Sequence, residues 1–390
     1  MDYRLFSVSE NQLRILIQEK NFAALNITYP YKEKILPFLD QLDDVAAATL
    51  SVNTVLNDHG QLIGYNTDYF GFEQLLAHHK IDLKDKVVAV LGSGGSSKTL
   101  QHLIKKLTPH LVVVSRTPTA DQYSYEQFRL YPKIDVLINA TPLGSFPDIH
   151  ASPIDLLKLS THPKTVIDLT YNPYRTKLLI QAEELGCQIA NGLWMLLAQA
   201  FSSHALFCGT YPINVTIEQL NYGFNKSNNI VLIGMPGCGK STIGQYLATK
   251  LKRDFIDTDV LIAQRENDTT DNIIRNKGIE YFREVEQEVI ARLSGVLNAV
   301  IASGGGIIED SRNITALKTF GRVYFIDRPL EELNPDDTHP LSSSQEDLFK
   351  LYYRRYNSYD KLSDVKLSND TSVEETAKKV EENFYANCHN

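Results

Sequence analysis

The chain has 390 residues, of which 43% are hydrophobic and 22% charged, and its formal net charge is −8 at pH 7. This length favours two or three domains, and the acidic balance argues against nucleic acid as a partner, because clustered Lys and Arg bind phosphate backbones. The four cysteines form no CxxC pair, and neither a signal peptide nor an apolar run of about 18 residues is present. We therefore expect a cytoplasmic protein without zinc, disulfides or membrane contact.

The first clear element is a strand that runs into a glycine-rich loop and a helix, KVVAVLGSGGSSKT at residues 86–99. Further apolar runs at 110–115, 134–140 and 165–170 are separated by helical stretches. This alternation predicts a parallel sheet with helices on both faces. The glycine loop at the start of the helix is typical of a dinucleotide-binding site.

The strand that follows the loop indicates which dinucleotide is bound. An NAD site usually has Asp or Glu at the end of this strand for the ribose hydroxyls. Here the strand ends in Ser115-Arg116-Thr117, and a basic residue there favours a cofactor with a 2′-phosphate, NADP(H). The alternative is that Arg116 is an exposed strand-end charge. The expected cofactor-binding residues are Gly92, Gly94, Gly95, Ser115, Arg116 and Thr117.

A polar stretch near residues 221–229 separates this part from a second α/β pattern. We place the linker at 223–228. The strands expected after it are 229–233, 254–257, 298–303 and 321–327, with a helix from Lys240 and closing helices around 345–358 and 372–386.

The second half opens on a phosphate-binding loop, because GMPGCGKS at residues 234–241 satisfies GxxxxGK[ST]. Glycines let successive N–H groups surround phosphate oxygens at a helix N-terminus. Lys240 is expected to reach the β- and γ-phosphates, and Ser241 to bind Mg²⁺. The expected nucleotide-binding residues are Gly234, Gly237, Gly239, Lys240, Ser241 and Thr242.

Residues further along suggest the acceptor of the phosphoryl group. Two carboxylates at the end of the second strand could serve a metal-bound water and an acceptor hydroxyl, and guanidinium groups could hold a small carboxylate. Singly, the two aspartates could be strand-end caps, and Arg283 could pair with Glu286 on a solvated helix face. The residues in question are Asp257, Asp259, Arg283, Glu286, Gly304, Gly305, Gly306, Arg354 and Arg355.

In this order the motifs of residues 229–390 resemble shikimate kinase. The resemblance implies that Asp259 accepts the proton of the shikimate hydroxyl and that Asp257 supports Mg²⁺. It also implies that Arg283 and Arg355 hold the substrate carboxylate and that residues 304–306 line the ring. In the family, an Arg before a Pro-Leu pair in the lid contacts phosphate. Here His339 takes its place, which predicts a slow kinase or one in which another basic group moves in to take this role.

Residues 3–210 resemble shikimate dehydrogenase. The matching stretches are LNITYPYKE at 25–33, SVNTV at 51–55, GYNTDYFGF at 64–72, DLTYNPYRTKLL at 168–179 and NGLWMLLAQA at 191–200. The resemblance implies that Lys32 and Asp68 are the catalytic pair. It further implies that Asn53 and Gln199 bind substrate hydroxyls and that Tyr171 lines the junction.

One departure from this family concerns the start of the chain. The family begins with a strand and an S-x-S-P turn whose serines hold the shikimate carboxylate, and the present sequence begins about one βα unit later. Ser7 and Ser9 have S-x-S spacing without the proline, and Ser9 with Gln12 is better interpreted as a helix capping box. We expect a bare sheet edge as a consequence.

The predicted architecture is therefore α/β throughout. A dehydrogenase-like part at 1–222 would contain a truncated substrate domain (about 1–80 with 191–222) and a Rossmann domain (about 81–190), followed by a kinase-like part at 229–390 with a nucleoside-monophosphate-kinase-like parallel sheet. The predicted protein makes shikimate with NADPH and phosphorylates it with ATP and Mg²⁺. The alternatives are a kinase joined to a weak dehydrogenase-like binding or scaffold module, and a nucleotide-gated interaction protein.

Overall fold

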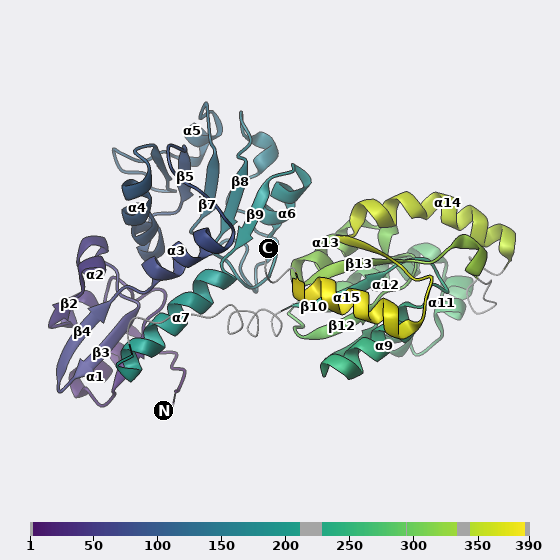
Figure 1. The fold of residues 1–390 in the computed structure, drawn as a ribbon, viewed down its shortest axis with the longest axis horizontal. Coiled ribbons are helices and arrows are strands. Elements are labelled where there is room, and N and C mark those ends of the chain that lie inside the picture. Colours follow the sequence, from purple (N-terminus) through teal and green to yellow (C-terminus); the bar gives the residue numbers. More distant parts are fainter. Residues whose placement is uncertain (1–2, 211–227, 294, 334–343, 387–390) are drawn as a thin grey trace. The chain divides into compact units, whose positions relative to one another are not determined.

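The computed structural model of the chain describes residues 3–210, 228–293, 295–333 and 344–386. The chain forms two compact units, which are drawn in Figure 1. Unit 1 comprises Met1–Pro142, Pro153–Thr170 and Ala182–Thr216, and unit 2 comprises Leu143–Ser152, Tyr171–Gln181 and Ile217–Asn390. None of the helices in the described ranges combines the length and apolar character that a membrane span requires.

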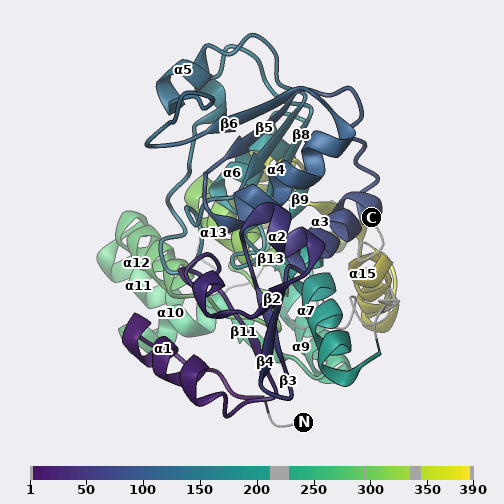
Figure 2. The ribbon, with the colours of Figure 1, turned by 90° about the vertical axis from the view of Figure 1, so that its left-hand side faces the viewer.

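The first sheet of unit 1 consists of four short strands, β1 (Ala24–Asn26), β2 (Gln41–Leu42), β3 (Thr54–Asp58) and β4 (Gln61–Tyr65). Their order is β1-β3-β4-β2. The central strands β3 and β4, which Figure 2 shows next to each other, are antiparallel, and β2 runs parallel to β4. Within the described residues β1 pairs with β3 alone, so it forms an edge of the sheet.

Helix α1 (Glu10–Glu19) covers this sheet with Leu13 and Ile17, which are buried in one core with strand residues such as Val55. It begins at the predicted capping box. The Ser9 N–H donates to Gln12 Oε1 at 2.7 Å, and the Gln12 N–H donates to Ser9 Oγ at 3.4 Å. The interpretation of Ser9 as a cap is therefore confirmed.

Two helices from distant parts of the sequence pack against each other in unit 1, α3 (Asp68–His78) and α7 (Leu193–Cys208). Figure 1 shows them side by side. Their buried faces include Phe72 and Leu75 from α3 and Trp194 and Ala198 from α7. The packing carries Asp68, at the start of α3, and Gln199, in α7, into one neighbourhood. The unit also contains η1 (Leu36–Phe38) and α2 (Asp44–Thr49).

The second sheet of unit 1 is the predicted parallel sheet. Its strands have the order β6-β5-β7-β8-β9, and every pairing is parallel. All residues of β5, β7 and β8 are buried, which explains why these strands appear as continuous apolar runs. The elements are β5 (Val88–Leu91), α4 (Gly95–Leu107), β6 (Leu111–Val114), α5 (Tyr125–Arg129), β7 (Val136–Asn139), η2 (Leu156–Lys158), β8 (Thr165–Asp168), α6 (Lys177–Glu184) and β9 (Gln188–Asn191).

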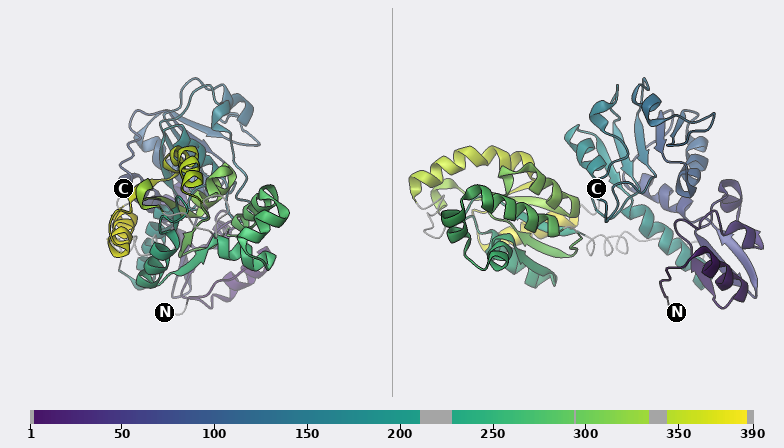
Figure 3. Two further views of the ribbon diagram at one scale, coloured as in Figure 1. Left: turned by 90° about the vertical axis from the view of Figure 1, so that its right-hand side faces the viewer. Right: turned by 180° about the vertical axis from the view of Figure 1, so that it is seen from behind.

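Unit 2 is built on a five-stranded parallel sheet of order β11-β12-β10-β13-β14. Figures 1 and 3 view this unit from opposite sides and show helices on both faces of the sheet. The strands are β10 (Asn229–Ile233), β11 (Asp254–Asp257), β12 (Ala299–Ala302), β13 (Gly321–Asp327) and β14 (Val365–Ser368). The first four confirm the predicted strands. β14 was not predicted, because it is a short edge strand without fully buried residues.

The helices of unit 2 include the predicted helix at Lys240 and the two predicted closing helices, α14 and α15. The phosphate loop follows the central strand β10, so it opens at the carboxyl edge of the sheet, where ligands bind in open α/β sheets. The elements are α9 (Lys240–Leu251), α10 (Thr258–Glu266), α11 (Thr270–Lys277), α12 (Ile279–Arg292), η3 (Ile307–Glu309), α13 (Ser311–Phe320), η4 (Leu330–Glu332), α14 (Gln345–Leu362) and α15 (Val373–Ala386).

A buried ion cluster stabilises unit 2. The Arg175 guanidinium donates to both carboxylate oxygens of Asp364, at 2.9 and 2.5 Å, and Lys318 lies 3.3 Å from the same carboxylate. The side chains of Arg175 and Asp364 are less than a tenth exposed. Burial raises the pKa of Asp364, but Arg175 and Lys318 outweigh this effect and bring the pKa down to about 2.

Candidate active sites

The glycine loop of unit 1 has the backbone that a dinucleotide needs. Gly92 has a φ of +106°, which favours glycine, and its N–H donates to Val114 O at 2.8 Å. A Cβ at Gly94 would meet nothing within 4 Å, so a ligand can approach this backbone closely. Helix α4 begins at Gly95 and directs its N-terminal N–H groups to the same place.

The strand-end residues predicted for the cofactor adjoin this loop. Strand β6 is the parallel neighbour of β5, and Ser115 Oγ lies 3.2 Å from Ser93 Oγ in the loop. The Thr117 N–H donates to Ser115 Oγ at 3.3 Å, and Arg116 is exposed. Arg116 is therefore accessible to a 2′-phosphate, and its role stays a prediction.

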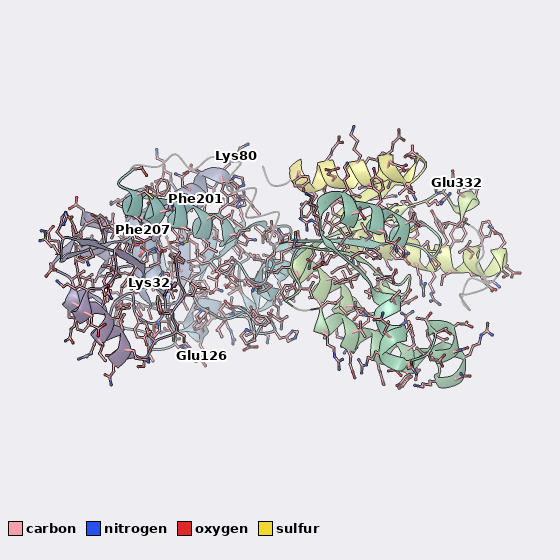
Figure 4. All side chains as sticks on the ribbon, turned by 90° about the horizontal axis from the view of Figure 1, so that it is seen from below. Lys32, Lys80, Glu126, Phe201, Phe207 and Glu332 are labelled. Atoms are coloured by element: carbon pink, nitrogen blue, oxygen red, sulfur yellow. The ribbon has the colours of Figure 1, made fainter. Side chains whose placement is uncertain are left out.

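Four residues predicted for the dehydrogenase chemistry meet in one cluster of unit 1. Lys32, labelled in Figure 4, comes from the turn between β1 and η1 and donates to Asp68 Oδ2 at 2.5 Å. Asn53 Nδ2 donates to Asp68 Oδ1 at 2.9 Å and to Gln199 Oε1 at 3.2 Å. The side chains of Lys32 and Asp68 are 18% and 6% exposed, so the pair is largely shielded from water.

Three hydroxyl groups that were not singled out from the sequence belong to the same cluster. Thr67 Oγ1 accepts from Asn53 Nδ2 at 2.9 Å, and Ser203 Oγ lies 3.0 Å from Thr67 Oγ1. Ser96 Oγ, from the glycine-loop helix α4, accepts from Lys32 Nζ at 3.4 Å. Ser203 could have been found by helical spacing, because it lies four residues after Gln199 on α7.

The fifth predicted residue of the dehydrogenase site, Tyr171, belongs to unit 2, where its side chain is 48% exposed. Its role stays a prediction.

The phosphate loop of unit 2 is curled as expected. Gly234, Gly237 and Gly239 all have positive φ, and α9 begins directly after Gly239. A Cβ at Gly234 would come within 2.6 Å of Ile326 O, so only glycine fits there. The Lys240 ammonium is buried inside the curl, where it donates to the carbonyls of Gly234 and Met235 at 3.0 and 2.8 Å. Asn369 Nδ2, which sequence reasoning missed, holds the loop from outside by donating to Cys238 O at 2.7 Å.

The predicted magnesium residues are neighbours. Ser241 Oγ donates to Asp257 Oδ2 at 2.7 Å. The other oxygen of Asp257 accepts the Asp259 N–H at 3.0 Å, so Asp257 also caps α10, as the alternative interpretation proposed. A hydroxyl and a carboxylate oxygen are the hard ligands that Mg²⁺ prefers, so this pair fits the ion when it accompanies a nucleotide. No group of three or more His, Cys, Asp or Glu side chains placed to hold a metal occurs among the residues described.

The three glycines after β12 each make room for a different neighbour. A Cβ at Gly304 would clash with Asp259 Oδ1, and one at Gly306 would clash with Arg283 Nη2. Between them, a Cβ at Gly305 would meet the ring of Pro236 in the phosphate loop at 2.9 Å. The glycine turn therefore brings the predicted base and one predicted guanidinium to the edge of the phosphate loop.

The two predicted carboxylate-binding arginines both reach this turn. Arg283 Nη1 donates at 2.7 Å to Glu286, whose side chain is 1% exposed, so the pair does not lie on a solvated helix face. Burial raises the pKa of Glu286, and Arg283 offsets this only partly. Arg355, only 2% exposed, donates from Nη1 to Gly305 O at 3.2 Å. The alternative that Arg283 and Glu286 are merely a surface pair is not supported.

His339, the residue predicted to slow the kinase, lies outside the described residues, as does most of the predicted linker at 223–228.

These sites define the chain as a nucleotide-dependent enzyme with two active centres. Residues 236–384 match the family model for shikimate kinase, and residues 1–55 match that for the shikimate dehydrogenase substrate binding domain.

Curated relatives cover the dehydrogenase-like part. The chain is 34% identical over 219 residues to a shikimate dehydrogenase (NADP(+)) of Clostridium botulinum strain 657, a match spanning 53% of this chain and 84% of the relative. It is 35% identical over 223 residues to that of Pyrococcus abyssi, spanning 53% and 82%. The solved structure of shikimate dehydrogenase 1 from Peptoclostridium difficile is 31% identical to this chain, with a TM-score of 0.51. The match spans 56% of this chain and 84% of that structure.

The chain belongs to the shikimate dehydrogenase family. Its later part carries a shikimate kinase domain, so it is a bifunctional shikimate-pathway enzyme, and the predicted fusion is confirmed.

Proposed function

We propose that this enzyme carries out two consecutive reactions. The residues around Lys32 reduce 3-dehydroshikimate to shikimate with NADPH, and the residues around the phosphate loop convert shikimate to shikimate 3-phosphate with ATP and Mg²⁺. The names of the relatives, which are NADP(+) enzymes, support the choice of cofactor. The scattered cysteines support a cytoplasmic location.

The short, shielded contact between Lys32 and Asp68 carries the proposal for the reduction. NADPH supplies the hydride when it is bound at the glycine loop. A ketone that accepts hydride also needs a proton at its oxygen, and the Lys32 ammonium donates it. Asp68 holds this ammonium in place, and Asn53 and Gln199 bind the hydroxyls of the ring. Because Lys32 also contacts Ser96 on the glycine-loop helix, the proton donor is held near the cofactor.

The proposal for the phosphorylation rests on the glycine turn at residues 304–306. Asp259 accepts the proton of the attacking hydroxyl, and Arg283 and Arg355 hold the carboxylate of shikimate. Lys240 neutralises charge on the transferred phosphoryl group, and Ser241 with Asp257 would hold Mg²⁺, which would supply further positive charge for the phosphates. Phosphoryl transfer depends mainly on such positioning and charge neutralisation.

The two reactions share one oxygen atom. Reduction turns the 3-ketone of 3-dehydroshikimate into a hydroxyl, and phosphorylation acts on that same hydroxyl. A chain that joins both sites therefore makes its own acceptor for the second step.

Two assays on the full chain test the proposal. NADPH oxidation with 3-dehydroshikimate should depend on Lys32, and Lys32→Ala should abolish it while phosphorylation of shikimate continues. Asp259→Asn should give the reverse pattern. If wild type oxidises NADPH no faster than Lys32→Ala does, the first part is a binding module and the reduction proposal is wrong.

A further inference from the structure

Two neighbouring arginines of α14, Arg354 and Arg355, are held by one acidic residue that no motif identifies. Glu309 is the last residue of η3, three positions after Gly306. Its Oε1 accepts from Arg355 Nε at 2.7 Å and from Arg354 Nη2 at 2.5 Å. It therefore connects the glycine turn to helix α14.

This contact fixes one edge of a buried guanidinium. Arg355 is 2% exposed, and its Nε and Nη1 are bonded to Glu309 and to the carbonyl of Gly305. The same carbonyl also accepts from the hydroxyl of Tyr359, a fully buried residue one turn further along α14. Arg355 Nη2 is buried and has no hydrogen-bond partner among the described residues. A buried N–H group of this kind needs an acceptor, and a substrate carboxylate supplies one.

Glu309 is ionised in this setting. Burial raises its pKa, but the hydrogen bonds from Arg355 and Arg354 outweigh that and hold the pKa below its usual value. The neighbouring charges are then three guanidinium groups against the carboxylates of Asp259, Glu286 and Glu309. The set is balanced, so it is the buried N–H group at Arg355 Nη2, without a partner among the described residues, that offers a place for an anion.

The two arginines bound to Glu309 are in different environments. Arg354 is 61% exposed, whereas Arg355 is almost completely buried. An exposed ion pair contributes little, while a buried charge that loses its partner is strongly perturbed. Glu309 therefore acts mainly on Arg355.

We propose that Glu309 is the positioning residue that aims Nη2 of Arg355 at the carboxylate of the kinase substrate. The inference rests on the proposed phosphorylation of a hydroxy acid and adds a residue that sets its carboxylate affinity. With Nε and Nη1 already bonded, Arg355 loses little side-chain entropy when the substrate binds. Without Glu309, Arg355 reorients to satisfy Nε, and the substrate has to bring it back.

The test compares Glu309→Ala and Glu309→Gln with wild type in the full-length enzyme. Glu309→Ala should raise the KM for shikimate about tenfold, which is the size of effect expected from one charge-assisted hydrogen bond. Glu309→Gln should have a smaller effect, because its amide oxygen can still accept from Nε. In both variants kcat and the KM for ATP should stay within about twofold of wild type.

Two controls separate positioning from general structural damage. Lys350→Ala removes an exposed ion pair with Glu346 on the same helix, α14, and should leave the KM for shikimate nearly unchanged. An acceptor in which a hydroxymethyl group replaces the carboxylate should be used equally well by wild type and both Glu309 variants. The inference would be overturned if the Glu309 variants lost equal activity with both acceptors. It would also be overturned if kcat and the midpoint of thermal unfolding fell together.

The direction in which the KM for shikimate changes also tests the proposal. A KM for shikimate that falls in Glu309→Ala would show that Glu309 competes with the carboxylate, and an unchanged KM would show that it does not position Arg355; either result overturns the proposal. If wild type itself fails to phosphorylate shikimate, the proposed function is wrong, and this outcome is distinct from the other two.

Discussion

Lys32 donates to one oxygen of the Asp68 carboxylate over 2.5 Å, and Asn53 donates to the other oxygen. Both oxygens of Asp68 are therefore engaged, and the ammonium of Lys32 has a fixed direction. The pair comes from a turn of the small sheet and from the first residue of α3, so the fold rather than local sequence brings it together.

This arrangement predicts that Asp68→Asn lowers kcat for NADPH-dependent reduction by about 100-fold, a typical contribution of a positioned proton donor. The variant keeps the shape of the side chain and removes the charge that holds the ammonium. The measurement is steady-state NADPH oxidation. The rate of shikimate phosphorylation in the same protein is the internal control and should not change.

The glycine turn predicts two different kinetic defects for two similar substitutions. In Gly304→Ala the new methyl group displaces Asp259, so kcat for phosphorylation should fall. In Gly306→Ala it displaces Arg283, so the KM for shikimate should rise by about tenfold or more. The KM for ATP should change little in Gly306→Ala. The same defect in both variants would contradict the separate roles of the two neighbours.

The ion cluster at Asp364 predicts a pH-dependent contribution to stability. Because the pKa of Asp364 is lowered in the folded state to about 2, its contribution is present above its ordinary value of 3.8 and is lost as pH falls towards 2. Asp364→Asn should therefore lower the free energy of unfolding at pH 7 by about 2 kcal/mol.

Urea unfolding followed by circular dichroism at pH 7, 5 and 3 tests this prediction. The difference between wild type and Asp364→Asn should be similar at pH 7 and 5 and smaller at pH 3. Asp360→Asn, at an exposed position of α14, is the matched control and should have little effect. A difference that grows at pH 3 would contradict the assignment.

The contact between Ser241 and Asp257 predicts a metal defect. Ser241→Ala should raise the Mg²⁺ concentration needed for half-maximal phosphorylation, because it removes one oxygen ligand. Thr249→Ala, which removes an exposed hydroxyl from the same helix, is the control. If both variants need the same Mg²⁺ concentration as wild type, Ser241 does not bind the ion.

The sequence predicts one further kinase property. His339→Arg should raise the turnover number for phosphorylation, because a guanidinium stabilises phosphoryl charge better than an imidazole. Turnover at saturating ATP and shikimate measures this, and a rate equal to or below wild type would show that His339 does not limit the kinase.

Much of the fold could be predicted because buried parallel strands appear in a sequence as apolar runs. The strands at 229–233, 254–257 and 321–327 agree with the structure at both ends. The edge strand β14 was missed because half-buried positions alternate with exposed ones and leave no such run. Both glycine loops were found, because positive φ and close backbone approach restrict those positions to glycine.

The candidate sites were predictable where a motif fixes the residues and not where tertiary packing does. Ser96 joins the Lys32 cluster through helix α4, whose packing cannot be inferred from local patterns. Glu309 was missed because its partners, Arg354 and Arg355, lie about 45 residues away on another helix. The different neighbours of Gly304 and Gly306 likewise appear only when the turn is folded.

The central claim is that one chain makes shikimate and then phosphorylates it. Its most direct test is to incubate the full-length protein with 3-dehydroshikimate, NADPH, ATP and Mg²⁺ and to follow the products by mass spectrometry. Wild type should form shikimate 3-phosphate, Asp259→Asn should stop at shikimate, and Lys32→Ala should leave 3-dehydroshikimate unchanged. Failure of wild type to form shikimate from 3-dehydroshikimate, with phosphorylation of added shikimate intact, would contradict the claim.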